Sequence, residues 1–339
     1  MPEKQITIED IAKALNMSKT TVSRALSGKG RIGEETRERV VRYAERHSYK
    51  PNSIAKSLAE MKTYNIGFVI PKEYAITELS FYQKCLWGIS QVATSNNYDV
   101  LVTMIADDDI SQLNRIVENK KVDGLILGRT SCVNTIEQFL GSKGVPFVTV
   151  GSSVDSSVLQ VDNDHEGACQ DLTYKLIKSG VRKLALIGGD TKYIVNRNRY
   201  HGFVKAFENA DMKVYEERIF LSCNTTTKIE EAVDRAIEAD AECILCMDDD
   251  ICMKVLNKFH RDGLRIPDDI MVGSFYNSHI LKGNPVKITA INFDETKLGE
   301  VACRTLLDRF SDVKPIKKVL LGYEISIQES THKKKHSEL

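Results

Sequence analysis

Residues 6–26, ITIEDIAKALNMSKTTVSRAL, decide the organisation of the N-terminal part of the chain. Thr7 can cap a first helix, and Asp10, three residues later, completes a partial capping box. Apolar residues then recur at helical spacing, at Ile8, Ile11, Ala12 and Leu15. The pattern breaks at Asn16, and Ser18 is placed to cap a second helix. The spacing predicts two short helices joined by a tight turn, which is a helix-turn-helix.

The second helix has two unlike faces. Its apolar face carries Thr21, Val22, Ala25 and Leu26, and its opposite face carries the hydrogen-bond donors Lys19, Thr20, Ser23 and Arg24. These donors occupy the first two turns, the part of a recognition helix that reaches base edges in the major groove. An ordinary helical hairpin with a solvated basic face would have the same spacing.

The distribution of charge favours the nucleic-acid interpretation. The 339 residues carry 47 basic and 47 acidic side chains, so the net charge is zero. Residues 1–63 hold thirteen Lys and Arg against eight Asp and Glu, whereas the remainder holds 34 against 39. A basic head on an acidic body indicates that the head meets a polyanion.

The head continues with a third helix and a linker. The third helix is expected from residue 34 to about residue 47, with Val40, Tyr43, Ala44 and His47 completing a three-helix core. Residues 51–63 follow, with Pro51 suited to a helix start and barely two turns of apolar spacing. A helix this short is unstable alone in water. The segment is therefore either a flexible linker or a hinge helix that forms only on DNA and against a second copy.

The body, from about residue 64, alternates short apolar runs with amphipathic stretches. Buried strands are expected at residues 66–70, 100–104, 124–127, 147–150, 183–187, 243–247, 270–272 and 288–291. Helical patterns lie between them, as at residues 83–95 and 164–179. This alternation predicts parallel sheets with helices on both faces. There are more strands than a single sheet usually contains, which favours two subdomains with a cleft between them.

Several segments resemble, in order and spacing, the lac/gal repressor family of bacterial transcription regulators. In the head these are residues 7–26, RIGEETRERV at 31–40 and YKPNSIAKSLA at 49–59. In the body they are VDGLILG at 122–128, VDNDHEGA at 161–168, RYHGF at 199–203, GLRIPDDIMVG at 263–273 and TAINFDETKLGEVA at 289–302. The resemblance covers nearly the whole chain.

The resemblance implies a small all-α helix-turn-helix head and an α/β body of two doubly wound parallel-sheet subdomains, like a type I periplasmic binding protein. A periplasmic binding protein itself would lack the head and carry a signal peptide, which the polar N-terminus does not resemble. The implied domains are the head at 1–50, the hinge helix and linker at 51–63, the N-subdomain at 64–161 plus 292–321, the C-subdomain at 162–291 plus 322–331, and a disordered tail at 332–339.

By resemblance, the head residues divide into three groups of DNA contacts. Base readers are Lys19, Thr20 and Arg24, and arginine to guanine is the commonest specific contact. Phosphate contacts are Thr7, Ser18, Thr21, Ser23 and Arg31, although an exposed arginine is as often merely solvated. Leu58, with Ala55 beneath it, is the minor-groove residue of the hinge. A lone hinge helix has nothing to pack on, so the mechanism requires a homodimer.

By resemblance, the effector site uses residues from both subdomains. They are Phe81, Tyr82, Asp162, Asn163, Arg199, Asp248, Asp249 and Phe275, with Arg199 as a ligand clamp and Tyr82 as a stacking aromatic. Each aspartate could equally cap a helix. After residues 272–273 the family usually continues Tyr-Asp-Asp, whereas this chain reads SFYN at 274–277. An aromatic in place of an acid favours a sugar with flat apolar faces, such as maltose or another oligosaccharide.

Other chemistry is not predicted. The eight cysteines show no disulfide framework, which indicates a reducing cytoplasm, and Cys243 and Cys246 are expected to be buried thiols rather than zinc ligands. No cofactor, metal site, catalytic residue or membrane segment is expected. The prediction is a cytoplasmic, DNA-binding transcription regulator, most simply a repressor of a sugar operon. The rival is a small-molecule binding protein or enzyme whose helical head does not bind DNA.

Overall fold

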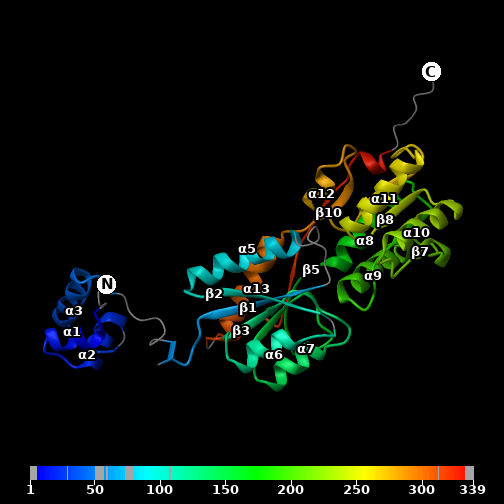
Figure 1. Ribbon diagram of the computed structural model, residues 1–339. Helices are drawn as coiled ribbons and strands as arrows, with labels where there is room; N and C mark the ends of the chain where they lie inside the picture. Colours follow the sequence, from blue (N-terminus) through cyan, green and yellow to red (C-terminus); the bar gives the residue numbers. More distant parts are fainter. Residues whose placement is uncertain are drawn as a thin grey trace. The chain divides into compact units, whose positions relative to one another are not determined.

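The computed structural model describes residues 6–28, 30–49, 57–58, 60–72, 80–106, 108–311 and 313–332. The chain forms two compact units, Met1–Thr63 and Tyr64–Leu339 (Figure 1). Among the described residues, no helix is long and apolar enough to cross a membrane.

The first unit is a three-helix head made of α1 (Ile8–Ala14), α2 (Lys19–Ser27) and α3 (Glu34–Arg46). The capping box at Thr7 is present, because the Thr7 hydroxyl accepts from the Asp10 amide and the Asp10 carboxylate accepts from the Thr7 amide. The turn after α1 places Asn16 at a φ of 51°, in the left-handed region that asparagine tolerates. The helix-turn-helix predicted from the sequence is therefore confirmed.

The head has a small hydrophobic core. Its fully buried members are Ile11, Ala12, Val22, Ala25, Val40 and Ala44. Tyr43 packs against this cluster, as expected, but the placement of His47 in the core is wrong. His47 follows the last turn of α3 and is exposed, and its ring packs on Tyr43 with centroids 4.4 Å apart.

In the second unit, one sheet has the strand order β11-β5-β4-β3-β1-β2 and is parallel throughout. Its strands are β1 (Asn65–Pro71), β2 (Asp99–Ile105), β3 (Gly124–Leu127), β4 (Phe147–Val150), β5 (Leu159–Asn163) and β11 (Lys318–Leu321). Ile66, Phe68 and Ile70 share a core with α5 (Ser80–Ser95) and α13 (Glu295–Arg309), whereas Val69 faces α6 (Ser111–Glu118) and α7 (Thr135–Ser142). This alternation along β1 puts helices on both faces of the sheet, here named the N-subdomain.

The other sheet, here named the C-subdomain, has the order β12-β10-β9-β8-β6-β7. Its strands are β6 (Leu184–Ile187), β7 (Ile219–Phe220), β8 (Cys243–Cys246), β9 (Met271–Ser274), β10 (Thr289–Asn292) and β12 (Glu324–Ser326). Only the pairing of β10 with β12 is antiparallel among these described strands. Its helices are α8 (His165–Lys178), α9 (Ile194–Glu208), α10 (Thr226–Glu238), α11 (Asp249–Asp262) and the short α12 (His279–Lys282), with single 3₁₀ turns at Glu216–Arg218 and Glu329–Thr331.

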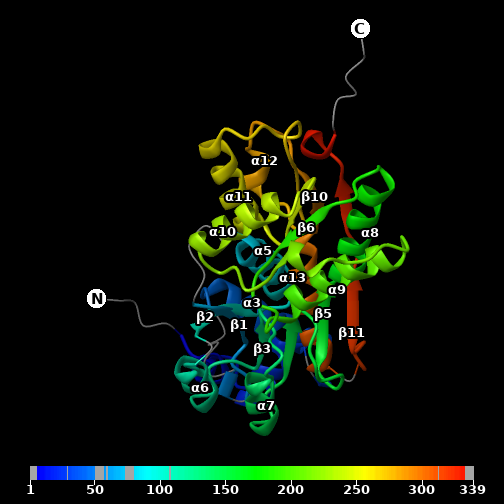
Figure 2. The same cartoon turned by 90° about the vertical axis from the view of Figure 1, so that its right-hand side faces the viewer.

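The chain crosses between the two sheets three times, from β5 to α8, from β10 to α13 and from β11 to β12. In Figure 2, β5 and β11 lie on one side of the body and β2 on the other. One ring from each crossing joins a small aromatic cluster: Phe293 lies 4.8 Å from His165 and 6.5 Å from Tyr323, between centroids. The crossings are therefore gathered at one edge of the body and packed against each other.

Glycines allow the helix pairs of the body to approach closely. A Cβ added at Gly299 on α13 would lie 2.1 Å from the Cys85 carbonyl oxygen on α5, and one at Gly202 on α9 would lie 2.2 Å from the Glu166 carbonyl oxygen on α8. No side chain fits at these distances. The geometry of α5 against α13 therefore depends on Gly299.

Candidate DNA-binding and effector-binding sites

The recognition face of α2 has the geometry the sequence predicts. Ser18 caps the helix, accepting from the Thr21 amide at 3.0 Å, and Val22 and Ala25 are buried against the head core. The four donors on the opposite face, Lys19, Thr20, Ser23 and Arg24, are all exposed. The first two turns of α2 thus present a continuous set of hydrogen-bond donors to solvent.

Two of these donors have partners within the head. The Lys19 ammonium forms an ion pair with Glu9 of α1, and this contact holds the pKa of the Glu9 carboxyl below its usual range. To read a base, Lys19 must exchange its ion pair with Glu9 for a contact with DNA. Breaking this exposed pair costs little free energy, because surface ion pairs are weak. The Arg24 stem lies beside Gly30 in the turn after α2, where an added Cβ would be 3.3 Å from Arg24 Cδ. Arg31 is exposed on the same connection.

The hydroxyls predicted to contact phosphate are also used in helix caps. Ser18 Oγ lies 2.8 Å from Thr21 Oγ1, and Thr7 Oγ1 donates to the Asp10 carboxylate at 2.7 Å. A hydroxyl both donates and accepts, so the Ser18 and Thr21 pair retains one donor for a phosphate oxygen. The Thr7 amide and hydroxyl both donate to the Asp10 carboxylate, so a phosphate contact from Thr7 requires one of these hydrogen bonds to be exchanged for one to the phosphate.

The linker is described only in part. Ala55 lies outside the described residues. Leu58 is 81 % exposed, and Lys62 N–H donates to the Ser57 carbonyl at 3.0 Å, which closes a single helical turn. A large apolar side chain on one turn of helix is available for a minor-groove contact.

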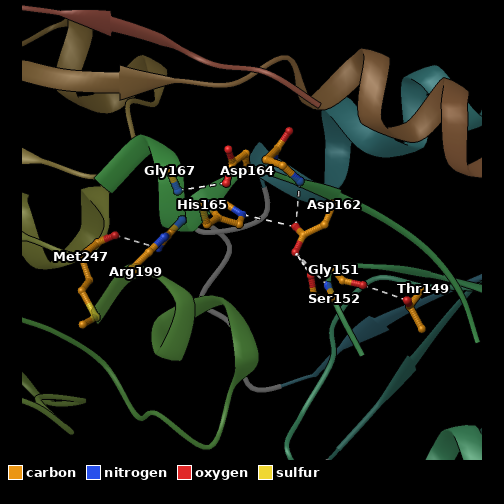
Figure 3. A network of polar contacts seen from close by, with 10 residues as sticks. Thr149, Gly151, Ser152, Asp162, Asp164, His165, Gly167, Arg199 and Met247 are labelled. Carbon is orange, nitrogen blue, oxygen red and sulfur yellow. Dashed lines mark hydrogen bonds and ion pairs between the residues drawn. The ribbon is translucent and has the colours of Figure 1, made fainter. Parts of the chain in front are cut away.

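In the body, a buried polar network surrounds the end of β5 (Figure 3). Asp162 is 4 % exposed and accepts from the amide and hydroxyl of Ser152, both at 2.8 Å, and from the Asn163 amide at 2.8 Å. Burial raises the pKa of the Asp162 carboxyl, against the lowering effect of these hydrogen bonds. Asp162 therefore holds the turn after β4 against the segment in which the chain first crosses from the N-subdomain to the C-subdomain.

Three buried polar atoms near this crossing have no hydrogen-bond partner among the described residues. They are Asn163 Oδ1, His165 Nδ1 and Arg199 Nε. Burial, and then the positive charge of Arg199, hold the pKa of His165 well below its usual value, so its imidazole is neutral and its 3.5 Å contact to Asp162 is a weak hydrogen bond rather than an ion pair. Buried polar atoms are almost always satisfied. An ordered water or a polar ligand would satisfy these three atoms.

Arg199 of α9 contacts the residue before Asp248 and so joins α9 to the start of α11. The Arg199 guanidinium donates to the Met247 carbonyl at 2.7 Å (Figure 3). Asp248 caps α11 by accepting from the Ile251 amide at 2.8 Å, as the capping alternative predicted. Burial raises the pKa of Asp248 to about 6, despite the opposing effect of Arg199. Asp249 follows in the first turn of α11 and has part of its surface exposed.

The aromatic candidates fall on both sides of the cleft. Tyr82 is buried in the N-subdomain core, with its ring 6.5 Å from Phe68. Phe81 is partly exposed, and its ring meets Tyr276 edge-on at 6.4 Å. The structure therefore brings Phe81, rather than Tyr82, to face the C-subdomain.

Phe275 does not lie where its predicted role, stacking on the effector, would require. Phe275 follows β9 and has no exposed surface, because its side chain lies in the C-subdomain core. A residue so placed is not available to stack on a ligand. The next residue, Tyr276, points toward the other subdomain, and its hydroxyl donates to Glu295 at 2.6 Å. Sequence spacing could not settle which of the two adjacent aromatics faces the other subdomain, because both follow the end of β9 at Ser274, where strand alternation no longer fixes the direction of a side chain.

Family models match two segments of the chain: "Bacterial regulatory proteins, lacI family" over residues 7–52 and "Periplasmic binding protein-like domain" over residues 173–331. The MalR regulator of Streptococcus pneumoniae is 29 % identical over 93 % of this chain and 95 % of its own length. The ExuR repressor of Bacillus subtilis is 28 % identical over 97 % and 99 %. The chain therefore carries the two domain types of LacI-family transcription regulators, a lacI-family head and a periplasmic-binding-protein-like body.

Solved structures agree with this assignment of fold. A Lac repressor dimer bound to operator and an anti-inducer superposes with a TM-score of 0.76 at 20 % identity, covering 97 % of this chain and 99 % of that one. A CelR–cellobiose complex superposes with a TM-score of 0.73 at 22 % identity, covering 96 % and 100 %. With this pair of domains, the protein is a DNA-binding transcription regulator whose body is an effector-binding domain.

Proposed function

We propose that this LacI-family regulator represses a sugar-utilisation operon by binding a two-fold operator as a homodimer. The observation that carries the proposal is the exposed donor face of α2, opposite a side that is fully committed to the head core. Arg24, Lys19 and Thr20 read base edges, while Thr7, Ser18, Thr21, Ser23 and Arg31 contact phosphates. Leu58, with Ala55, enters the minor groove at the central step.

An unpartnered apolar surface on the N-subdomain supports the homodimer. Trp87 on α5 is 64 % exposed, and Val102 and Met104 on the edge strand β2 are 44 % and 42 % exposed. The helix and the strand are adjacent in the fold, since α5 packs beside β2. Large apolar groups clustered on one surface are typical of a protein–protein interface.

We propose a sugar as the effector, bound where β5, α9 and the loop after β9 meet. Asn163 Oδ1, Arg199 Nε and His165 Nδ1 offer one donor and two acceptor positions to hydroxyl groups, and Phe81 and Tyr276 offer aromatic faces. In this proposal Asp162 and Asp248 orient their neighbours, and Asp249 reaches the ligand from the start of α11. The relatives support a sugar, since one is titled a maltose operon repressor and another was solved with cellobiose.

Effector binding would change the angle between the subdomains and so the spacing of the two hinge segments. The coupling must be reciprocal, because operator binding weakens effector binding by the same factor. The strand memberships support the proposed division at 64–161 plus 292–321 and at 162–291 plus 322–331. We place the protein in the cytoplasm, where its eight free cysteines remain reduced.

Footprinting tests the proposal directly. The purified chain should protect a two-fold site in the promoter region of its own operon, and maltose or cellobiose should release it. Calorimetric titration should give heat with one of these sugars. Heat with a nucleobase and with none of the sugars would contradict the sugar assignment while leaving the DNA-binding role intact.

A further inference from the structure

An acidic side chain lies at the end of α2 that is proposed to read bases. Residues 7–28 contain two acids, Glu9 and Asp10. Asp10 is used in the capping box of α1 with Thr7. Glu9, in the first turn of α1, forms an ion pair with Lys19, the first residue of α2. The Glu9 and Lys19 side chains are 54 % and 58 % exposed, so the pair faces solvent beside the donor face of α2.

The ion pair is not needed to hold the head together. Exposed ion pairs contribute little to stability, and the buried core of the head is formed by apolar side chains of α1, α2 and α3. The contact with Lys19 keeps the pKa of Glu9 below its usual range, so Glu9 is charged at neutral pH. Near DNA, phosphates repel this carboxylate. A favourable role for Glu9 on DNA therefore requires a base that donates a hydrogen bond to it.

One base pair matches the order of donor and acceptor in the ion pair. The major-groove edge of G·C presents guanine N7 and O6, which accept, and then the cytosine amino group, which donates. An ammonium fits the first two groups and a carboxylate fits the third, while the two side chains remain paired. In A·T, thymine O4 replaces the cytosine amino group and repels a carboxylate. In C·G the donor and acceptors are exchanged, and in T·A a methyl group replaces one acceptor.

We propose that Glu9 and Lys19 read one G·C base pair together, with the ammonium donating to guanine and the carboxylate accepting from the cytosine amino group. Glu9 is then a specificity-determining residue on α1, outside the recognition helix. On duplexes that offer no such donor, the phosphates repel the carboxylate and binding is weaker, which adds to specificity. The inference rests on the base-reading role proposed above for Lys19, and it adds a second residue and the base pair that the two recognise.

Selection from a randomised duplex library, with the full chain, tests this assignment. The wild type should enrich sites with G·C at one symmetric position of each half-site. In Glu9→Ala the preference at that position should fall at least about threefold, because the acceptor for the cytosine amino group is gone. Preferences at other positions, including those read by Arg24, should stay. Glu9→Ala should also bind random duplex about two- to fivefold more tightly, since a charge repelled by phosphates has been removed.

A double-variant comparison tests whether the two side chains act as a unit. Lys19→Ala should lose preference at the same position as Glu9→Ala, and the double variant should lose no more there than Lys19→Ala alone. Glu38→Ala is the matched control, since it removes an exposed acid that pairs with Arg42 on α3. This control should leave every base preference unchanged.

Three results would overturn the inference. They are unchanged base preferences in Glu9→Ala, a change at a position that Lys19→Ala does not affect, and a preference for a base pair other than G·C at the shared position. Each of them leaves the DNA-binding role of α2 intact. A wild-type protein that enriches no site would contradict both the proposed function and the role of Glu9.

Discussion

At the scale of single residues, the proposed base reader Arg24 gives the sharpest test of DNA recognition. Its side chain is exposed on α2, and bidentate contact with a guanine is worth about 1–3 kcal/mol of discrimination. Arg24→Ala should weaken operator binding about 5- to 100-fold and binding to random duplex only a few-fold, as measured by fluorescence anisotropy. Arg42→Ala, which removes an exposed arginine paired with Glu38 on α3, is the control. Equal losses on both duplexes would remove Arg24 from the base-reading role.

The stability of the body should depend on pH through Asp248, and the shifted pKa of Asp248 sets the sign of this dependence. Burial raises its folded-state pKa from 3.8 to about 6, so the folded state binds a proton more tightly than the unfolded chain does. The Asp248 contribution to stability is therefore greatest below pH 4 and is lost as pH rises through 6. Asp248→Asn retains the helix cap without titrating.

The wild-type free energy of unfolding should consequently fall, relative to that of Asp248→Asn, by about 1–3 kcal/mol between pH 4 and pH 6.5. Urea unfolding at several pH values measures this difference. Parallel pH profiles for the two proteins would show that Asp248 ionises as an ordinary exposed carboxylate does.

At the scale of elements, the close approach of α5 and α13 depends on a glycine. Gly299→Ala forces a Cβ against the Cys85 carbonyl and must push the helices apart, which should lower stability by about 1–3 kcal/mol despite the better helix propensity of alanine. Gly141→Ala on α7 is a matched control, since nothing lies within 4 Å of the added Cβ. Thermal unfolding should show lower stability for Gly299→Ala and slightly higher stability for Gly141→Ala. Higher stability for both variants would show that α13 shifts freely to accommodate the added Cβ.

The elements also show how far sequence patterns reach. All eight strands expected from apolar runs are present, because buried parallel strands read as continuous apolar segments. The apolar runs leave out β5, β7, β11 and β12. β5 is interrupted by polar residues (LQVDN), whereas β7, β11 and β12 are short and lie at sheet edges, and β11 and β12 have no fully buried residue. At the site, local spacing predicts the cap at Ser18 and gives a cap as one of two alternatives for Asp248. The contact of Tyr276 with Glu295 is not predicted, since contacts between segments far apart in sequence leave no local pattern.

At the scale of the whole molecule, dimer formation should depend on the exposed apolar surface of α5 and β2. Trp87→Glu places a charge in the middle of that surface and should convert a dimer into a monomer at micromolar concentration, as measured by sedimentation equilibrium. Tyr215→Glu, at another exposed aromatic, should leave the dimer intact. If Trp87→Glu remains dimeric, the subunits associate through a different surface.

At the same scale, the head is the proposed DNA-binding part of the molecule and the body is its proposed regulator. Both the charge imbalance of residues 1–63 and the exposed donors on α2 favour this division. A regulator that reads sequence must prefer its operator over random DNA by a large factor, and its affinity must fall steeply with salt as counterions are displaced.

The most direct test compares binding to the protein's own promoter fragment and to a random duplex over a series of salt concentrations. The account predicts a preference of about a thousandfold or more for the promoter, with affinity for both duplexes falling steeply as salt rises. Equal affinity for the two duplexes at every salt concentration would contradict it.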